Sequence, residues 1–419
     1  MSRYERYPKY KDSGVEWLGQ VPEHWEVMQF KRIASICNGH DYKDVEDSNG
    51  AYPVIGSGGE FARASSYIFD GESVLLGRKG TIDKPLYING PFWAVDTMFY
   101  TKIADHAFPK FVYYNALTIP FALYSTNTAL PSMTNEDLSA HVIAVPEFTE
   151  QQTIAEALDS ETARIDALIA KKTRFIELLQ EKRAALINHA VTKGLDPEVK
   201  MKDSGVEWIG EVPAHWSVVP IKYVATVGNG STPNKDKDRY WGNGTFPWLT
   251  SGCVNHDEVW HAEQYVTEAA LRECHLPIIT PPAVLVGITG QGKTRGMAST
   301  LKIEATINQH IAYLKPMPKS VHVEFLRRFL DASYEWLRFD SEGVGSTKGA
   351  ITCEQLSNTK ISVPPRAEQE AIVDWIRRRT ERFNQLHLQT QRSIDLLQER
   401  RSAFITAAVT GQIDVRRSV

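Results

Sequence analysis

The sequence has little cysteine, no long apolar run and no excess of positive charge. Its four cysteines are scattered through 419 residues without a regular spacing, which is typical of a protein in a reducing compartment. The first ten residues carry charges instead of an apolar stretch, and no later segment approaches the roughly 18 apolar residues of a membrane span. We therefore expect a cytoplasmic protein that makes no contact with a membrane.

The charge balance excludes one broad basic face. Lysine and arginine number 47, aspartate and glutamate number 51, and the formal net charge is −4. A protein of this composition that binds DNA has to concentrate its positive charge on local loops. The hydrophobic fraction of 42% is enough for a sizeable core, and the length predicts about two to four domains.

Two repeated segments divide the chain into two copies of one plan. Residues 11–27, KDSGVEWLGQVPEHWEV, return 191 positions later as residues 202–218, KDSGVEWIGEVPAHWSV. Residues 142–192 return 218 positions later as residues 360–410, and both contain the pattern P-x-x-x-E-Q. The second copy is therefore 27 residues longer, and the extra length lies in its middle, where the copies differ most. Constant ends around divergent middles indicate a common frame that holds two different functional domains.

The divergent middles still share short apolar runs that end in glycine. Tyr52–Gly58 resembles Phe246–Gly252, and Ser73–Gly77 resembles Ala283–Gly287. Short aliphatic or β-branched runs punctuated by Gly and Asn are typical of strands and turns. Each middle is therefore predicted to be a mixed, mainly β domain.

The second repeated segment predicts a long helix in each copy. Residues 150–192 contain neither Pro nor Gly, and apolar side chains recur there every eleven residues, which is about three helical turns. Residues 368–410 repeat this pattern. We expect the two helices to bury these rows against each other as an antiparallel pair, although packing on their own domains is the alternative. The expected packing residues are Ile154, Ile165, Leu168, Ile176, Leu179, Ile187, Ile372, Phe383, Leu386, Ile394, Leu397 and Ile405.

Local signals add detail to this frame. Thr149 and Gln152 predict a capping box at the start of the first helix, and Gly194 predicts its end. Four tryptophans recur in the repeated motif, and we favour core packing for them over the alternative role of partner-docking anchors. They are Trp17, Trp25, Trp208 and Trp216.

The two motifs, their duplication and their order are similar to the specificity subunit of type I restriction-modification systems, and the resemblance covers nearly the whole chain. It implies an α+β fold in which two mixed, mainly β target recognition domains are joined by two long antiparallel α-helices, with a pseudo-two-fold internal repeat. The implied segments are a first target recognition domain at 1–147, a long helix at 148–196, a second target recognition domain at 197–365, and a second long helix with a C-terminal tail at 366–419.

The resemblance also implies a function and partners. In such a subunit each target recognition domain reads one half of a split, asymmetric site in double-stranded DNA, and the helices set the spacing between the halves. The helices also dock two adenine-N6 methyltransferase subunits, and restriction-translocase subunits can join the complex. S-adenosylmethionine, ATP and Mg²⁺ are used by these partners, so we expect no catalytic residue, cofactor or metal site in this chain.

The resemblance does not name individual DNA contacts, because these vary between members of the family. Gly-rich turns with nearby cations and hydroxyls are the best candidates, since backbone amides, Ser and Thr bond phosphates while Arg, Lys, Asn and Gln read base edges. In the first domain we select Ser57, Arg63, Arg78, Lys79, Thr81 and Lys84. In the second domain we select Asn229, Ser231, Thr232, Lys235, Lys237, Arg239, Thr289, Gln291, Lys293, Arg295 and Lys348.

Two patterns suggest other chemistry. Gly287–Thr294 matches the phosphate-loop pattern G-x-x-x-x-G-K-[ST], which would make the chain a DNA-dependent ATPase, but a phosphate loop opens a helix and the sequence here predicts a strand. A group of cysteines and histidines suggests zinc, but its spacing fits no standard zinc finger and the first copy has no equivalent. This group is Cys253, His256, His261, Cys274 and His275. A structural adaptor that binds no DNA is the third interpretation.

Overall fold

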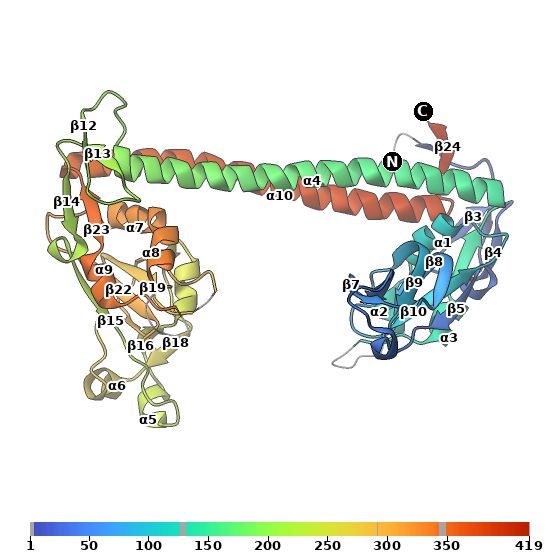
Figure 1. Cartoon of the computed structure of the whole chain (residues 1–419), viewed down its shortest axis with the longest axis horizontal. Coiled ribbons are helices and arrows are strands. Elements are labelled where there is room, and N and C mark those ends of the chain that lie inside the picture. The colour runs from blue at the N-terminus through green and yellow to red at the C-terminus, as the bar shows by residue number, and fades with distance from the viewer. Residues whose placement is uncertain (1–3, 126–130, 291, 343–348, 419) are drawn as a thin grey trace. The chain divides into compact units, whose positions relative to one another are not determined.

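The computed structural model of the chain describes residues 4–125, 131–290, 292–342 and 349–418, and Figure 1 labels its elements. The chain forms two compact units, Met1–Thr173 with Thr390–Val419, and Arg174–Gln389. Each unit contains one mainly β part and a part of each of the two long helices. The α+β fold with an internal repeat is therefore confirmed. The division into four segments stays a prediction, because each of the two compact units takes a part of both long helices and so does not follow those segments.

The first unit is built on a six-stranded sheet whose central strand is covered on both faces. Val74 and Leu76 point into the core beneath the helices, whereas Leu75 points into the core on the other face, because successive side chains of a strand alternate. All three are fully buried, which explains the continuous apolar run at this point of the sequence. In sheet order the strands are β5 (Ala34–Asn38), β10 (Met98–Ile103), β8 (Phe69–Gly77), β9 (Leu86–Ala94), β6 (Tyr52–Gly56) and β7 (Gly59–Ala64).

The second unit repeats this arrangement around its own central strand. Val284 and Val286 face one core, Leu285 faces another, and all are fully buried. In sheet order the strands are β15 (Ala225–Asn229), β22 (Ile311–Pro316), β19 (Ala283–Gly287), β20 (Ala298–Leu301) and β17 (Glu258–Val259), and a smaller sheet holds β18 (Gln264–Val266), β16 (Phe246–Leu249) and β21 (Thr306–Ile307). The helices α5 (Asp238–Trp241) and α6 (Glu268–Glu273) surround a further small core that contains Trp248 and Val266.

The two long helices, α4 (Phe148–Lys193) and α10 (Arg366–Val409), are continuous. In the first unit Ile154 of α4 shares a core with Ile405 of α10, and in the second unit Ile187 shares a core with Ile372, so the helices run antiparallel. The expected packing residues are all buried or half-buried. Seven of them are buried, namely Ile154, Ile165, Leu179, Ile187, Ile372, Ile394 and Ile405, and the half-buried ones are Leu168, Ile176, Phe383, Leu386 and Leu397.

The ends of α4 agree with the sequence in one case and differ in the other. Gly194 follows the helix with a φ of +79°, a conformation that glycine adopts without strain, so the predicted stop is confirmed. The predicted capping box is wrong, because the helix already begins at Phe148 and Thr149 lies inside it. The side chain of Gln152 instead donates a hydrogen bond to Glu156, 2.8 Å away.

The repeated motifs meet at the start of each long helix. In the first unit the carboxylate of Glu150 accepts hydrogen bonds from Trp25 Nε1 at 3.3 Å and contacts His24 Nε2 at 2.9 Å. In the second unit Glu368 makes the same contacts with Trp216 Nε1 at 3.0 Å and His215 Nε2 at 2.8 Å. The His-Trp pair of the first motif and the glutamate of the second motif therefore recur together. Their contacts fix each long helix to the segment directly before β4 (Glu26–Gln29) in the first unit and before β14 (Ser217–Pro220) in the second.

The glutamine of the pattern P-x-x-x-E-Q fixes a second helix. Gln151 Oε1 accepts the backbone N–H of Phe108 at 2.8 Å, directly before α1 (Pro109–Ala116), and its Nε2 donates to the carbonyl of Pro146 at 2.9 Å. Gln369 repeats both bonds, with the N–H of His322 before α7 (Val323–Ala332) and with the carbonyl of Pro364. The short helix that covers each sheet is thereby held against the long helix.

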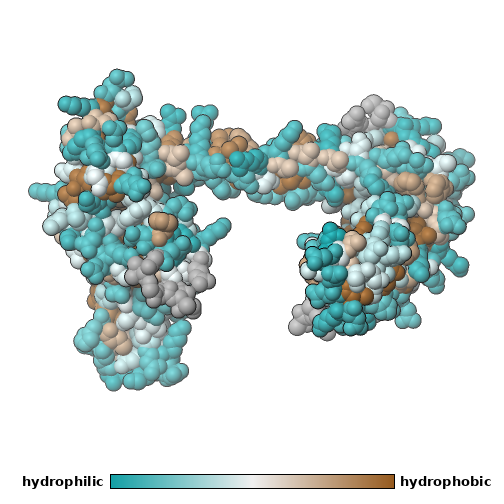
Figure 2. Space-filling view, viewed as in Figure 1, coloured by the Kyte–Doolittle hydropathy of each residue, from teal (hydrophilic) through white to brown (hydrophobic). Residues whose placement is uncertain are grey.

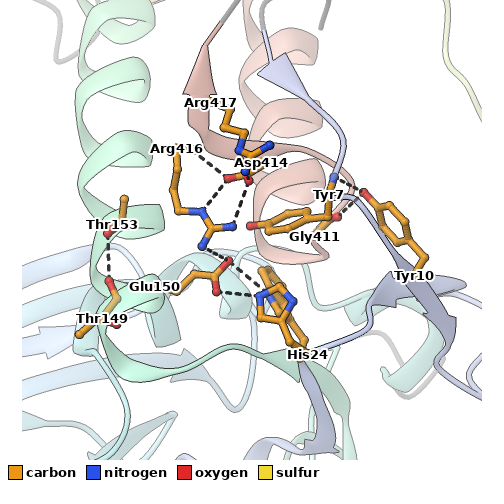
Figure 3. A network of polar contacts seen from close by, with 11 residues as sticks. Tyr7, Tyr10, His24, Thr149, Glu150, Thr153, Gly411, Asp414, Arg416 and Arg417 are labelled. Carbon is orange, nitrogen blue, oxygen red and sulfur yellow. Dashed lines mark hydrogen bonds and ion pairs between the residues drawn. The ribbon is translucent and has the colours of Figure 1, made fainter.

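The C-terminal segment completes the contacts of Glu150 in the first unit. β24 (Asp414–Ser418) pairs with β1 (Tyr4–Glu5), and Arg416 reaches both Asp414, at 2.8 Å, and Glu150, at 3.4 Å (Figure 3). Burial acts against the charged form of Asp414, but the hydrogen bonds and charge of Arg416 outweigh burial and lower the pKa of that carboxyl. The network therefore ties the last strand of the unit to the first turn of α4.

The four tryptophans are divided by their burial. Trp25 and Trp216 are fully buried, and the core-packing interpretation is confirmed for them. Trp208 is half-buried against Phe329 and Trp336, while Trp17 is 37% exposed and stacks on His141.

Within the described residues, every helix is too short or too polar to serve as a membrane span.

Candidate nucleic-acid interface

In both units the central strand runs into a loop that folds back on it. A Cβ on Gly77, at the end of β8, would lie 2.3 Å from the carbonyl oxygen of Thr81. A Cβ on Gly287, at the end of β19, would lie 2.4 Å from the carbonyl oxygen of Thr294. Only glycine permits this close return of the backbone, which explains why the apolar run of each copy ends in glycine.

Several loops gather at the same edge of each sheet. The register of the first sheet places Asn38 opposite Phe99 and Gly77 opposite Met98, so the end of β5, the start of β10 and the end of β8 adjoin. The second sheet repeats this placement with Asn229 opposite Ala312 and Gly287 opposite Ile311. We call the sheet edge at Asn38, Gly77 and Met98, with the loops that extend from it, the first loop edge, and the edge at Asn229, Gly287 and Ile311 the second loop edge.

A further segment closes each loop edge. In the first unit the N–H of Gly80 donates to the carbonyl of Pro131 at 2.9 Å, and the N–H of Met133 donates to Arg78 at 2.9 Å. In the second unit the N–H of Ile351 donates to the carbonyl of Ile288 at 2.8 Å. Backbone pairing of this kind fixes the loops, so the side chains that they carry are presented from a rigid base.

At the first loop edge the structure brings together four of the selected residues. Arg78, Lys79, Thr81 and Lys84 all lie in the loop after β8, and all except the half-buried Arg78 are exposed. The guanidinium of Arg78 donates to the carbonyl of Asp96 at 3.3 Å and lies 5.8 Å from the ring centre of Phe99.

The other two residues selected in the first unit belong to a different part of the sheet. Ser57 is in the hairpin between β6 and β7, and Arg63 is on β7, at the opposite end of the strand order from β5. Arg63 forms an ion pair with Glu60 at 3.1 Å. The first loop edge is therefore built without them.

At the second loop edge, selected residues are joined through two that sequence reasoning missed. Thr232 Oγ1 donates to Gln309 Oε1 at 2.5 Å, Gln309 Nε2 lies 3.2 Å from His310 Nε2, and His310 Nδ1 lies 2.7 Å from Thr289 Oγ1. Gln309 and His310 are exposed, whereas the two threonines are half-buried. The available signal was the polar triplet Asn-Gln-His between two apolar strands, which turns the chain at this edge.

The remaining selected residues of the second unit differ in their surroundings. Lys235 and Lys293 are exposed, Lys237 lies 5.5 Å from the ring centre of Tyr240, and Arg239 forms an ion pair with Glu273. Asn229 and Ser231 lie at and directly after the end of β15, exposed and half-buried respectively. Gln291 and Lys348 are outside the residues that the structure describes.

The selection of Arg295 needs correction. Its side chain is 3% exposed, and its guanidinium pairs with Glu342 at 2.9 Å. A guanidinium buried in this way cannot reach a base edge or a phosphate. In the sequence Arg295 looks equivalent to the nearby exposed Lys293, and only the fold shows that its side chain is buried.

The structure also bears on the two competing patterns. The described residues after Gly292 form a turn and then β20, so Gly287–Thr294 does not open a helix and lacks the geometry of a phosphate loop. In the described part of the chain, no three His, Cys, Asp or Glu side chains gather in a way that could hold a metal ion.

Comparison with known families decides between the remaining interpretations. The model of the family described as type I restriction modification DNA specificity domain matches residues 22–178 and again residues 213–395. The chain belongs to this family. As a type I DNA specificity protein it carries two copies of the family domain, and each match includes one sheet with its loop edge.

Two relatives match much of the chain at low sequence identity. The specificity subunit of the type I restriction enzyme EcoR124I/EcoR124II from Escherichia coli is 24% identical over 69% of this chain and 68% of its own length. The MjaVIII specificity subunit from Methanocaldococcus jannaschii is 21% identical over 95% of both chains. A solved structure from a study of complex assembly and conformational transition of the type I R-M system has a TM-score of 0.70 at 15% identity, covering 93% of this chain and 98% of its own. This last likeness establishes a shared fold.

Proposed function

We propose that the chain is the DNA-recognition subunit of a type I restriction-modification complex and has no catalytic activity of its own. In this proposal each unit reads one half of a split, asymmetric site in double-stranded DNA. The observation that carries it is the duplicated family match, with an equivalent loop edge in each matched half. Two equivalent frames with different loops suit the reading of two different sequences.

The long helices have two roles in the proposal. As continuous helices of fixed and nearly equal length, 46 and 44 residues, they set the number of unread base pairs between the half-sites. They also expose large apolar side chains, namely Phe175 and Leu178 on α4 and Leu388 and Leu396 on α10. Figure 2 shows hydrophobic patches among the hydrophilic residues along the long helices. Two methyltransferase subunits would bury these side chains, since exposed apolar patches mark protein interfaces.

The chemistry of the complex is assigned to the partners. The methyltransferase subunits would use S-adenosylmethionine, and restriction-translocase subunits would use ATP and Mg²⁺. This chain would supply positioning alone, through loops held by backbone hydrogen bonds.

The test is domain exchange in cells. The full chain is expressed with its own methyltransferase partner in a host without other adenine methylation, and methylated adenines are mapped across the genome. Replacing residues 219–360 with the matching segment of a relative should change one half of the methylated motif and leave the other half intact. A change in both halves, or methylation by the purified chain alone, would contradict the proposal.

A further inference from the structure

The second loop edge holds a linear chain of four hydrogen-bonded side chains from three separate segments. Thr232 follows β15, Gln309 and His310 precede β22, and Thr289 follows β19. The contacts measure 2.5, 3.2 and 2.7 Å in order along the chain. Because every member contacts its neighbour, the exposed amide of Gln309 is held from both ends.

The direction of the hydrogen bonds defines what the amide can still do. The hydroxyl of Thr232 donates to Gln309 Oε1, and the NH₂ group of Gln309 donates to His310 Nε2, which must then be the unprotonated nitrogen of a neutral ring. His310 Nδ1–H in turn donates to Thr289 Oγ1. The amide of Gln309 keeps a second N–H and a second lone pair on Oε1, both in the plane of the amide, for which the described residues supply no further partner.

This pair of free groups matches one base. In the major groove adenine presents an N6–H donor beside the N7 acceptor, whereas guanine presents two acceptors, cytosine a donor and thymine an acceptor with a methyl group. An amide that offers an acceptor and a donor together makes two hydrogen bonds with adenine only. The amide is also exposed, as a group that touches DNA must be.

Exposed lysines lie on the same segments as two members of this chain of hydrogen bonds. Lys235 and Lys237 follow Thr232 in the sequence and Lys293 follows Thr289, and all three are exposed. In protein–DNA complexes such cations bond phosphates and fix the register of the protein on the duplex, while base contacts provide the specificity.

We infer that Gln309 reads an adenine in the major groove, accepting from N6–H and donating to N7, and that Thr232, His310 and Thr289 position its amide. The inference rests on the proposed function and adds to it the base and the residue. It concerns one half-site only, since the first unit has a different side chain at the equivalent place.

The equivalent place in the first unit is identified by backbone contacts. The N–H of Ile288 donates to the carbonyl of His310, and the N–H of Arg78 donates to the carbonyl of Thr97. Asp96 therefore takes the place of Gln309. A carboxylate has no N–H to offer N7, so adenine cannot be read there in the same way.

The first experiment maps methylation directed by the full chain, expressed with its methyltransferase partner, for wild type, Gln309→Ala and Asp96→Ala. Gln309→Ala should relax one adenine position in the half-site assigned to residues 219–360, reducing discrimination on the order of 10- to 100-fold. The other half-site and the spacer should stay unchanged, and Asp96→Ala should leave that adenine selected. A Gln309→Ala motif identical to wild type would overturn the inference.

A second measurement separates base contact from a structural effect. The assembled complex is bound to a duplex with the mapped motif, and 7-deaza-2′-deoxyadenosine replaces the adenine concerned. Removing N7 should weaken binding by wild type and have no effect on Gln309→Ala; an equal loss in both would overturn the inference. Thr232→Val should reduce the wild-type sensitivity to this replacement and Thr232→Ser should restore it. If wild type itself produced no bipartite motif, the proposed function would fail, which is a distinguishable result.

Discussion

The two units use the same contacts to hold their frame and different side chains to fill their loop edges. Glu150 and Glu368 make matching bonds to a tryptophan and a histidine, although their positions lie 218 residues apart. The loop after β8 carries Arg78 and Lys79, whereas the loop after β19 carries Ile288 and Thr289. Sequence repetition within this chain therefore marks what supports the domains, and divergence marks what they present to a ligand.

The frames also differ in one respect, which is how deeply the central carboxylate lies. The side chain of Glu150 is 7% exposed and has Arg416 as an additional partner, while that of Glu368 is 29% exposed. The same substitution in the two units therefore removes different amounts of stabilisation.

The largest effect is expected from removing these carboxylates. Glu150→Ala leaves Trp25 Nε1 without its acceptor in a buried site and removes one of the two carboxylate partners of Arg416, which should lower the free energy of unfolding by about 3 kcal/mol. Glu368→Ala should cost about 1–2 kcal/mol, because water can replace the lost partner. Denaturant-dependent hydrogen exchange, followed at β8 and β19, measures each unit separately. Equal losses would show that burial and Arg416 add nothing.

An effect that appears only on acidification is expected from a histidine present in one unit only. His141 is 1% exposed beneath Trp17, with Nδ1 3.0 Å from Tyr124 Oη, and burial lowers its pKa to about 4. The matching residue of the second copy, 218 positions later, is Thr359. Acidification therefore bears on the two units differently.

The sign follows from which state takes up the proton. Between pH 6.5 and about 4 the unfolded chain binds a proton at His141 that the folded unit does not, so the first unit should lose up to about 3 kcal/mol over this range. In His141→Thr, which copies the second unit, this contribution should vanish. Unfolding free energies measured from pH 7 to 4 check the difference; parallel curves for wild type and variant would contradict it.

The sequence predicted the frame more fully than the loop edges, for a physical reason. The helix rows and the glycine that ends α4 are local patterns, and burial in the structure agrees with them. The capping box failed because α4 begins at Phe148, so Thr149 lies inside the helix. The side chains of Glu150 and Gln151 in its first turn bond instead to segments far away in the sequence, which no local pattern reveals.

The loop edges depend on such distant contacts throughout. Arg295 looks like a surface cation in the sequence, but its side chain is buried and pairs with the exposed Glu342, 47 residues away. Gln309 is distinguished only by the fold, which places its amide between Thr232 and His310. Composition identifies residues able to contact DNA, while tertiary pairing decides which of them are available.

The smallest effect tests whether the first loop edge reads a different base from the second. Arg78 donates one N–H to the carbonyl of Asp96, and the described residues offer its other N–H groups no acceptor; guanine is the base that presents two acceptors to a guanidinium. Arg78→Ala should cost about 1 kcal/mol of discrimination at one guanine of the half-site assigned to the first unit. The effect is small because Arg78 is half-buried and already donates one hydrogen bond to the carbonyl of Asp96. Arg78→Lys should not restore it, since an ammonium lacks the planar fork. Lys79→Ala is the control: a phosphate contact should weaken binding to all sequences alike and reduce its salt dependence. Binding of the assembled complex to duplexes with single substitutions measures both effects. Loss of discrimination in the other half-site would mean that the two units do not read independently.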